Sequence, residues 1–325
     1  MNTLLDMTGD IGIWLSTELD EVSAIMSEHL HNKHPEVNTV CGELAAYGGK
    51  MLRPSLLLLS WRATSNCVAV PKSVKTAAAV VELIHLATLV HDDILDEADI
   101  RRGLPTINSL RGNEAAVMLG DYLLSSAFHL CSTIKHVELN ILLGEVTNTL
   151  CSGELVQLSH RNSVDLSLDS YYQIIRDKTA SLIAASCEMG SVLGGGDDAV
   201  VSVLREFGNS IGTAFQIKDD LLDLLADQID IGKPAGRDLE KGKLTLPVIM
   251  MLAKNPELKH TVHDVILNND RAALHKLLLA ADSIPCARNE INRLVDSAVE
   301  GIKSAISNNS SEQLCNLANQ LKQEI

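Results

Sequence analysis

Aromatic side chains are scarce in this chain of 325 residues, since Phe, Trp and Tyr together make up only 3% of it. Hydrophobic residues still account for 46%, so the expected core consists mostly of Leu, Ile, Val and Ala. Long apolar runs are also missing, and no segment reaches the roughly 18 uninterrupted apolar residues of a transmembrane helix. The amino terminus lacks the basic and apolar regions of a signal peptide. We therefore expect a soluble globular protein with no integral membrane segment.

Cysteine pairs and an excess of basic residues are missing as well. The seven cysteines are scattered and none forms a CxxC pair, which predicts reduced thiols in the cytoplasm. Lys and Arg number 27 against 42 Asp and Glu, so the formal net charge is −15. This charge disfavours nonspecific binding to nucleic acid or to an anionic membrane. An anionic substrate must then be met by metal ions or by basic residues gathered at one place.

Regular alternation of apolar and polar residues is absent too, whereas helical spacing recurs along the whole chain. No low-complexity linker divides the sequence. We therefore predict an all-α protein with a single domain spanning residues 1–325. The predicted helices cover residues 9–31, 37–47, 75–98, 113–132, 136–159, 168–192, 198–227 and 245–254. Ser310 is the expected N-cap of a terminal helix.

Two aspartate clusters of the same shape are present, Asp92–Asp96 and Asp219–Asp223. Residues three and four apart share a helical face, so the three aspartates of each cluster converge. Such carboxylates repel one another unless a cation lies between them. Mg2+ takes oxygen ligands, often one or two carboxylates together with the phosphates of a substrate. Two such faces across a cavity could hold a metal-bound diphosphate; a solvated acidic face is less compatible with these apolar helices.

Further segments accompany the clusters in order: Gly48–Pro54, His85 with Arg101–Gly103, Lys178–Thr179, Phe215–Asp220, and Gly232–Asp238 followed by Gly242–Pro247. In these segments the chain resembles the trans-isoprenyl diphosphate synthases of the polyprenyl synthetase family, from Gly48 to about Pro247. The resemblance implies the isoprenoid synthase fold, a helical bundle around a central active-site cavity. It also implies a prenyltransferase that joins isopentenyl diphosphate to an allylic diphosphate, with farnesyl diphosphate as the expected primer.

The reaction implied by the resemblance is a head-to-tail (1'-4) condensation. The allylic diphosphate ionises, the double bond of isopentenyl diphosphate attacks the resulting cation, and a proton leaves. The resemblance implies three Mg2+ ions per site, for which Mn2+ can substitute, and these stabilise the charge on the leaving diphosphate. No side chain is indicated as the general base, and the released pyrophosphate is the expected proton acceptor.

The same resemblance assigns roles to individual residues. The expected metal ligands are Asp92, Asp96 and Asp219, with Asp93, Asp220 and Asp223 as further ligands or as hydrogen-bonding partners behind them. Isopentenyl diphosphate is expected to contact Lys50, Arg53, His85 and Arg102. The allylic substrate is expected to contact Arg101, Lys178, Thr179, Gln216, Lys218 and Lys233. The residues expected to act directly in catalysis are Asp92, Asp96, Arg101, Lys178, Asp219 and Lys233.

Some of these residues have a second interpretation. A lone histidine such as His85 on an apolar helical face could be a core residue. Lys243 could close over the site or cap a helix. The loop Gly232–Asp238 is a candidate lid.

Product length is expected to depend on Ala87 and Thr88, one turn before the first cluster. Small residues there leave a tunnel open for a long product, as in octaprenyl diphosphate synthases, and Ala87→Phe is expected to shorten the product. Ala87 could instead be small only to let two helices pack. Phe128, Cys131 and Leu143 are candidates for the floor of the tunnel.

Several other functions share these sequence features. A shorter-chain farnesyl or geranylgeranyl diphosphate synthase would carry the same motifs. A terpene cyclase would share the fold, but its second metal motif usually mixes Asn, Ser and Glu. A regulatory subunit of a heteromeric synthase would be expected to lose aspartates or arginines, whereas a catalytic subunit that needs a partner would not. The resemblance implies a homodimer.

Overall fold

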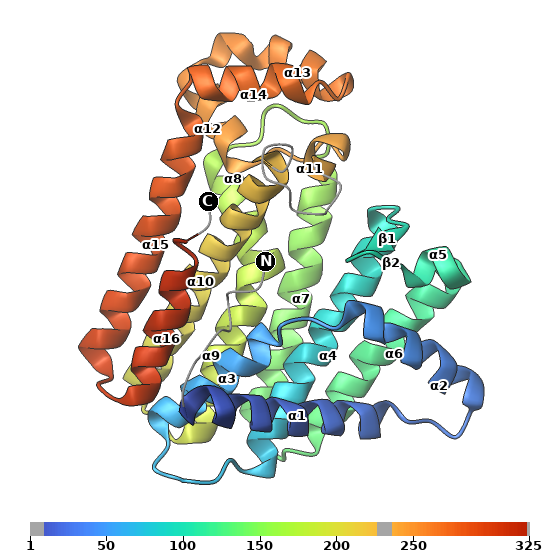
Figure 1. Ribbon diagram of the computed structural model, residues 1–325, viewed down its shortest axis with the longest axis vertical. Helices are drawn as coiled ribbons and strands as arrows, with labels where there is room; N and C mark the ends of the chain where they lie inside the picture. Colours follow the sequence, from blue (N-terminus) through green and yellow to red (C-terminus); the bar gives the residue numbers. More distant parts are fainter. Residues whose placement is uncertain (1–9, 226–235, 324–325) are drawn as a thin grey trace.

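The computed structural model describes residues 10–225 and 236–323, and most of them are helical, as predicted. Most of the long helices run side by side in one bundle (Figure 1). The long helices are α1 (Asp10–Leu30), α3 (Leu52–Thr64), α4 (Lys72–Leu95), α6 (Asn113–Ser132), α7 (Val137–Ser159), α9 (Ser181–Gly194), α10 (Asp198–Leu225), α15 (Ser283–Ala305) and α16 (Asn309–Gln320).

Shorter elements connect and cover the bundle. The short α-helices are α2 (Pro35–Gly42), α5 (Ile107–Arg111), α8 (Leu168–Ile175), α11 (Arg237–Glu240), α12 (Leu246–Lys254), α13 (Lys259–Leu267) and α14 (Arg271–Ala280). The 3-10 turns are Glu43–Tyr47 and Pro256–Leu258. The described residues contain one small hairpin, β1 (Ile100–Arg101) paired antiparallel with β2 (Leu104–Pro105).

The core has two parts, and α3 and α9 contribute to both. On one side they pack with α4, α6 and α1, and on the other with α10, α12, α15 and α16. Trp61 of α3 is the largest fully buried side chain, and Leu, Ile, Val and Ala fill most of the remaining core. The composition therefore predicted the kind of core that forms.

The first aspartate cluster lies at the end of α4, which is largely buried. Among the described residues, α4 is the one helix long and apolar enough to cross a membrane by length and composition, but 72% of that stretch is buried inside the fold. A core helix of this kind meets the same criteria. The helix was predicted over 75–98 but ends at Leu95, where Asp96 becomes its C-cap and donates its backbone N–H to the Asp92 carbonyl.

The predicted continuous helix over 168–192 is interrupted. After α8 the backbone forms a π-turn, Arg176–Ala180, before α9 begins. A π-turn inserts an extra residue into the helical repeat, and such turns occur often at functional sites. Lys178 and Thr179, both predicted to contact substrate, lie within this π-turn.

The terminal helix begins earlier than predicted. Asn308, not Ser310, is the N-cap of α16: its side chain accepts from the Ser311 N–H at 2.9 Å, and the Ser311 hydroxyl accepts from the Asn308 N–H at 3.1 Å. This reciprocal pair satisfies two backbone donors at once, which explains why the start lies at Asn308.

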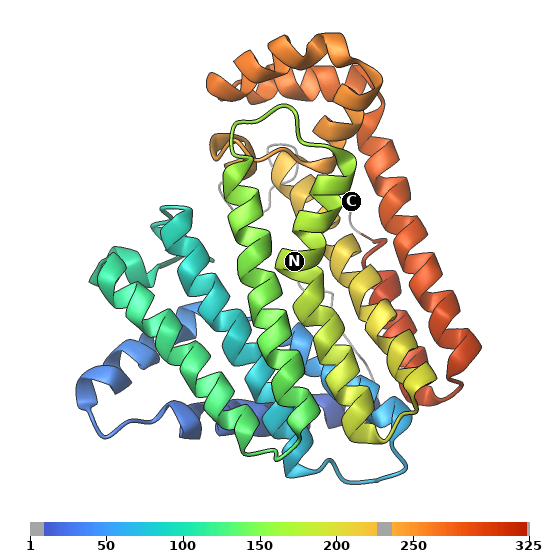
Figure 2. The same ribbon diagram turned by 180° about the vertical axis from the view of Figure 1, so that it is seen from behind.

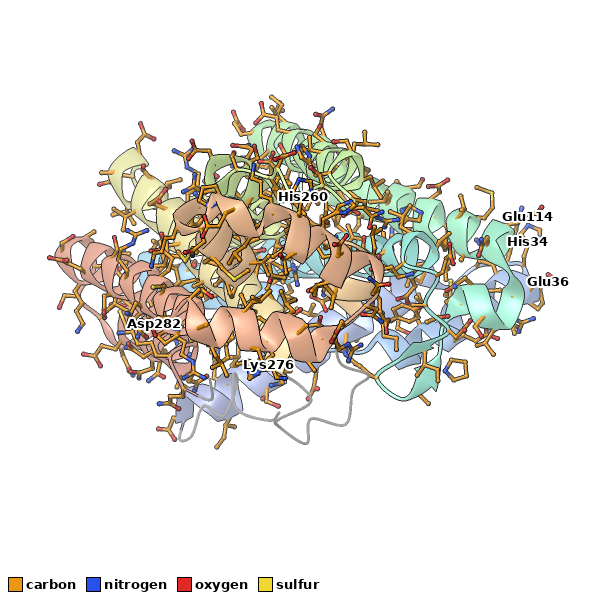
Figure 3. All side chains as sticks on the ribbon, turned by 90° about the horizontal axis from the view of Figure 1, so that it is seen from above. His34, Glu36, Glu114, His260, Lys276 and Asp282 are labelled. Atoms are coloured by element: carbon orange, nitrogen blue, oxygen red, sulfur yellow. The ribbon has the colours of Figure 1, made fainter. Side chains whose placement is uncertain are left out.

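Helices α13 and α14 lie across one end of the bundle, opposite α1 (Figures 1 and 2). Viewed from that end in Figure 3, this pair carries His260 and Lys276, whereas His34, Glu36 and Glu114 lie at the far edge, where α2 and α6 begin. Residues 236–245 lead into α12 beneath this end (Figure 1).

Helices α9 and α10 approach closely at Gly208. A Cβ atom at Gly208 would lie 2.7 Å from the Ala184 Cα atom and 2.9 Å from the Ile183 carbonyl oxygen, both in the backbone of α9. Backbone atoms cannot swing aside as side chains do. By contrast, a Cβ atom at Gly301 in α15 would have no neighbour within 4 Å.

We expect Gly208→Ala to lower the free energy of unfolding by about 1–3 kcal/mol, because the added methyl group forces two helices apart. Gly301→Ala is the control, and its better helix propensity should raise that free energy by up to about 1 kcal/mol. Urea denaturation followed by circular dichroism measures both variants. Equal stability of Gly208→Ala and wild type would contradict the close approach.

Candidate active site

A cavity of about 590 Å³ lies between α4, α7, α8, the π-turn and α10, and residues 238–245 complete its wall. Figure 2 shows α7 along this side of the bundle, beside α8 and α9. Both aspartate clusters contribute to the lining. The predicted site residues that line the cavity are Arg53, His85, Thr88, Asp92, Asp96, Arg101, Lys178, Thr179, Gln216, Asp219 and Asp220.

Two carboxylates of the first cluster face the cavity from the end of α4. Asp92 follows Thr88 by one turn, so both lie on the lining face. Burial raises the pKa of Asp92. Burial also acts to raise the pKa of Asp96, but the cationic groups of Lys243, Lys178 and Arg161 together outweigh it, and the net pKa is lowered. Lys243 Nζ donates to both Asp96 oxygens, at 3.0 and 3.2 Å, so this lysine closes onto the site.

Asp93 is turned away from the cavity and holds Arg101. Arg101 donates from Nη2 to Asp93 Oδ1 at 2.8 Å and from Nε to both carboxylate oxygens at 3.0 Å. The Asp93 residue is 1% exposed. Of its two predicted roles, the structure supports the hydrogen-bonding partner, because both oxygens are occupied by a bidentate guanidinium. The hairpin β1–β2 carries Arg101 back to this position.

The π-turn brings Lys178 against α7. A Cβ atom at Gly153 of α7 would lie 2.7 Å from Asp177 Cβ and 2.9 Å from the Lys178 backbone nitrogen, so α7 approaches only because this residue is glycine. Lys178 Nζ then donates to Gln157 Oε1 at 2.9 Å and lies 2.6 Å from Glu154 Oε2. Burial acts to lower the pKa of Lys178, but Asp92 and Glu154 raise it overall, so its ammonium stays charged beside the first cluster.

The second cluster divides into an exposed and a buried carboxylate. Asp219 is exposed at the cavity, whereas Asp220 is 7% exposed. Tyr171 donates its hydroxyl to Asp220 Oδ2 at 2.6 Å, and Gln216 Nε2 donates to Asp220 Oδ1 at 2.9 Å. Burial raises the pKa of Asp220 to about 6, while these two donors oppose the shift. Gln216 Oε1 in turn accepts from the Thr179 hydroxyl at 2.7 Å.

Asp223 faces the segment that comes after the cluster. Its Oδ2 accepts from the Asp238 backbone N–H at 3.0 Å, and its carbonyl accepts from the Gly236 N–H at 3.2 Å. Asp223 lines a separate small pocket of about 30 Å³ with Asp238 and Lys243. Asp223 therefore holds residues 236–238 against α10.

A basic group lies on the other side of the first cluster. Burial lowers the pKa of Arg53 to about 10, so the guanidinium stays charged, and its buried Nε has no hydrogen-bond partner among the described residues. Burial and the guanidinium groups of Arg53, Arg101 and Arg102 lower the pKa of His85 well below its ordinary value, so the imidazole is neutral. Burial raises the pKa of Glu82, while the guanidinium groups of Arg53 and Arg102 act to lower it.

Arg102 contacts the loop that precedes α3 and does not line the cavity. Its Nη1 donates to the carbonyl oxygens of Tyr47, at 3.1 Å, and of Gly48. Lys50, in the same loop, is exposed and does not line the cavity. Both residues therefore lie at the edge of the basic group formed by Arg53, His85 and Arg101.

Two predictions need correction. Lys218 does not reach the cavity: it is 6% exposed, and its Nζ donates to the carbonyl oxygens of Leu321, at 3.2 Å, and Gln323, at 2.5 Å. Adjacent helical residues point about 100° apart, so Lys218 and Asp219 face different directions. Ala87 is 0% exposed and packs in the core with residues of α6. Of the two residues Ala87 and Thr88, it is Thr88 that lines the cavity.

The remaining predictions about the tunnel and lid fall elsewhere. Cys131 and Leu143 are buried in the core and Phe128 is exposed, and none lines the cavity. Lys233 and most of the loop Gly232–Asp238 lie outside the described residues.

The sequence interpretation missed several polar residues that line the cavity, among them Glu154, Gln157 and Tyr171. Tyr171 lies seven positions before Lys178, about two helical turns, which could have indicated it. Glu154 and Gln157 carry no motif, because their place depends on how α7 packs at Gly153.

Comparisons with known proteins show which family the chain belongs to. The profile of the polyprenyl synthetase family matches residues 34–280. The octaprenyl diphosphate synthase of Escherichia coli (strain K12) is 33% identical over 287 residues, 87% of this chain and 88% of that protein. Component 2 of the heptaprenyl diphosphate synthase of Bacillus subtilis (strain 168) is 34% identical over 247 residues, 76% of this chain and 70% of that protein.

A solved structure agrees as well. The polyprenyl synthase from Caulobacter crescentus CB15, complexed with calcium and isoprenyl diphosphate, superimposes with a TM-score of 0.87 over 96% of each chain, at 28% identity. The match therefore extends over the helices that form the cavity. In sequence and fold, the chain is a member of the polyprenyl synthetase family of prenyltransferases.

Proposed function

We propose that this enzyme is an all-trans polyprenyl diphosphate synthase that uses Mg2+ to condense isopentenyl diphosphate with an allylic diphosphate. The observation that carries the proposal is one cavity lined by aspartates from two helices and by a separate basic group, Arg53 with His85 and Arg101. Two anionic substrates need two such subsites. A terpene cyclase, which takes one diphosphate, has no comparable use for the second.

The donors fit Mg2+ by their chemistry. Asp92, Asp96, Asp219 and Asp220 offer only carboxylate oxygens to the cavity, and hard cations take oxygen ligands. Within residues 10–225 and 236–323, no three acidic, histidine or cysteine side chains are arranged to hold a metal alone. This fits a cation that takes its remaining ligands from a substrate diphosphate. Bound there, Mg2+ would offset the charge that develops on the leaving diphosphate.

The residues of the chain act on the substrates in complementary ways. Lys178 and Lys243 place ammonium groups beside the first cluster, where they attract the allylic diphosphate and stabilise it as it leaves. The diphosphate of isopentenyl diphosphate binds to Arg53 and Arg101. The Nε of Arg53 is buried without a hydrogen-bond partner among the described residues, and Asp93 holds Arg101 in place. His85 stays neutral among them, so it donates a hydrogen bond without adding charge. Pyrophosphate accepts the final proton.

The proposed product is long. Thr88 is small and lies one turn from Asp92 on the cavity face, and apolar residues such as Leu89, Leu150 and Ile174 continue the lining. The similar proteins from E. coli and B. subtilis are named as octaprenyl and heptaprenyl diphosphate synthases, which supports this choice. A farnesyl or geranylgeranyl product is the alternative.

We also propose a homodimer that forms through α6 and α7. Seven large apolar side chains on these two adjacent helices are at least 38% exposed: Val117, Met118, Phe128, Val137, Ile141, Leu155 and Val156. Exposed apolar residues gathered in this way are typical of protein interfaces. The name "component 2" of the B. subtilis relative makes a heteromer the alternative. A cytoplasmic location is proposed because all seven cysteines are free.

A turnover assay tests the proposed reaction itself. With Mg2+, isopentenyl diphosphate and farnesyl diphosphate, the purified chain should elongate the primer, and Asp219→Asn should lower kcat at least about 100-fold by removing an anionic ligand. Asp197→Asn is the matched control: Asp197 caps α10 by accepting from the Val200 N–H at 2.9 Å, and Asn caps as well. Radiolabelled isopentenyl diphosphate measures turnover. No elongation by wild type would refute a homomeric synthase.

Product length should respond to Thr88 and not to Ala87. Thr88→Phe places an aromatic ring in the cavity one turn from Asp92, so products should become shorter while turnover continues. Ala87→Phe should instead lower the free energy of unfolding by about 1–3 kcal/mol, because it overpacks the core against α6. Chromatographic sizing of products and thermal denaturation separate the two. Full-length products from Thr88→Phe would rule out this wall of the cavity.

The interface prediction uses Ile141, which is 56% exposed on α7. Ile141→Lys should shift the protein from a dimer of 35.1 kDa chains toward the monomer, because a charge would be buried at the contact. Val68→Lys, at a position 98% exposed between α3 and α4, should leave the mass unchanged. Analytical ultracentrifugation measures both, and a monomeric wild type would contradict the homodimer.

A further inference from the structure

Tyr171 is a buried side chain whose polar end meets the second aspartate cluster. The residue is 3% exposed and belongs to the hydrophobic core, while its hydroxyl donates to Asp220 Oδ2 at 2.6 Å. In this contact the phenolic hydroxyl of Tyr171 is the donor and the Asp220 carboxylate is the acceptor. This hydrogen bond joins α8 to α10 at the edge of the cavity.

The contact completes a chain of hydrogen bonds that leaves Asp220 little freedom to rotate. Its other oxygen accepts from Gln216 Nε2 at 2.9 Å, and Gln216 accepts from the Thr179 hydroxyl at 2.7 Å. Two neutral donors from different elements therefore hold the two oxygens of one carboxylate. Such donors fix a direction without neutralising the charge.

Like charges surround this carboxylate. Asp219 and Asp223 lie beside it on α10, and the Asp238 backbone N–H donates to Asp223 Oδ2 at 3.0 Å, which brings a further carboxylate-bearing residue to the cluster. Repulsion would turn an unrestrained Asp220 side chain away from its neighbours. A hydroxyl held rigidly by a packed aromatic ring opposes that rotation.

We propose that Tyr171 is a positioning residue of the metal site: its hydroxyl keeps the Asp220 carboxylate turned toward the other aspartates, so that the second cluster is ready to receive a cation. Partners of this kind orient carboxylates and tune metal affinity. Tyr171 can have this role only if the aspartates bind cations as proposed above. The aromatic ring contributes packing, and the hydroxyl contributes the orientation.

The next residue supplies a matched control. Tyr172 packs edge-on against Tyr171, with ring centroids 5.8 Å apart, but its hydroxyl donates to Glu290 Oε1 of α15 at 2.9 Å. Tyr172 does not line the cavity. Tyr171→Phe and Tyr172→Phe thus each remove one hydroxyl group, at adjacent positions of α8. Each variant deprives a different carboxylate, Asp220 or Glu290, of one hydrogen bond.

The experiment measures cation binding directly. Mn2+ is titrated into the purified full-length protein with inorganic pyrophosphate present, and free Mn2+ is followed by electron paramagnetic resonance. We expect Tyr171→Phe to weaken Mn2+ binding about ten-fold or more, and Tyr172→Phe to bind as wild type does. Thermal denaturation without metal is recorded for each variant.

The outcomes separate a positioning role from a structural one. A lower melting temperature of Tyr171→Phe with unchanged Mn2+ affinity would overturn the proposal, as would equal loss of affinity in both variants. The Tyr171→Phe variant could unfold when metal is absent. In that case, refolding of the variant with pyrophosphate at the same Mn2+ concentration that saturates wild type would also overturn the proposal. Selective loss of Mn2+ affinity in Tyr171→Phe, combined with a wild-type protein that does not elongate farnesyl diphosphate, would support the role of Tyr171 while rejecting the proposed function.

Discussion

Repulsion among carboxylates in one partly buried cavity is the constraint on which the rest of the site depends. Burial raises the pKa of Asp92, and burial with neighbouring carboxylates raises those of Asp220 and Asp238. These shifts mean that the charged forms of these carboxylates are disfavoured where water solvates them poorly. A cation that bound there would relieve this repulsion. The free energy released would contribute to the affinity of the site for the metal.

The two clusters differ in the groups that contact their carboxylates and reduce that repulsion. Ammonium groups of Lys178 and Lys243 lie beside the first cluster and partly neutralise it. Asp220 of the second cluster is instead held by the neutral donors of Tyr171 and Gln216, which orient it and leave its charge intact. A leaving diphosphate would therefore meet protein cations on the side of α4 and depend more on bound metal on the side of α10.

The sequence predicted what depends on periodicity and failed where packing decides. The helical class, the extent of α6 and the meeting of both clusters in one cavity follow from apolar spacing and motif order. The direction of Lys218 did not, because it contacts carbonyl groups of the carboxyl terminus, about a hundred residues later. Asp93 and Arg101 are eight residues apart, and only the hairpin brings them together. Ala87 and Thr88 are adjacent, so their facing could not be assigned without knowing where α6 lies.

The π-turn links these observations. In a regular helix from 168 to 192, Tyr171 and Lys178 would lie on one face, two turns apart. The extra residue at Arg176–Ala180 rotates α9 relative to α8, so Tyr171 meets α10 while Lys178 meets α7 at Gly153. One interrupted helix thereby supplies a donor to the second cluster and a cation to the first. An unbroken helix could not serve both walls from positions this close, which gives a physical reason for the irregular backbone at this point in the chain.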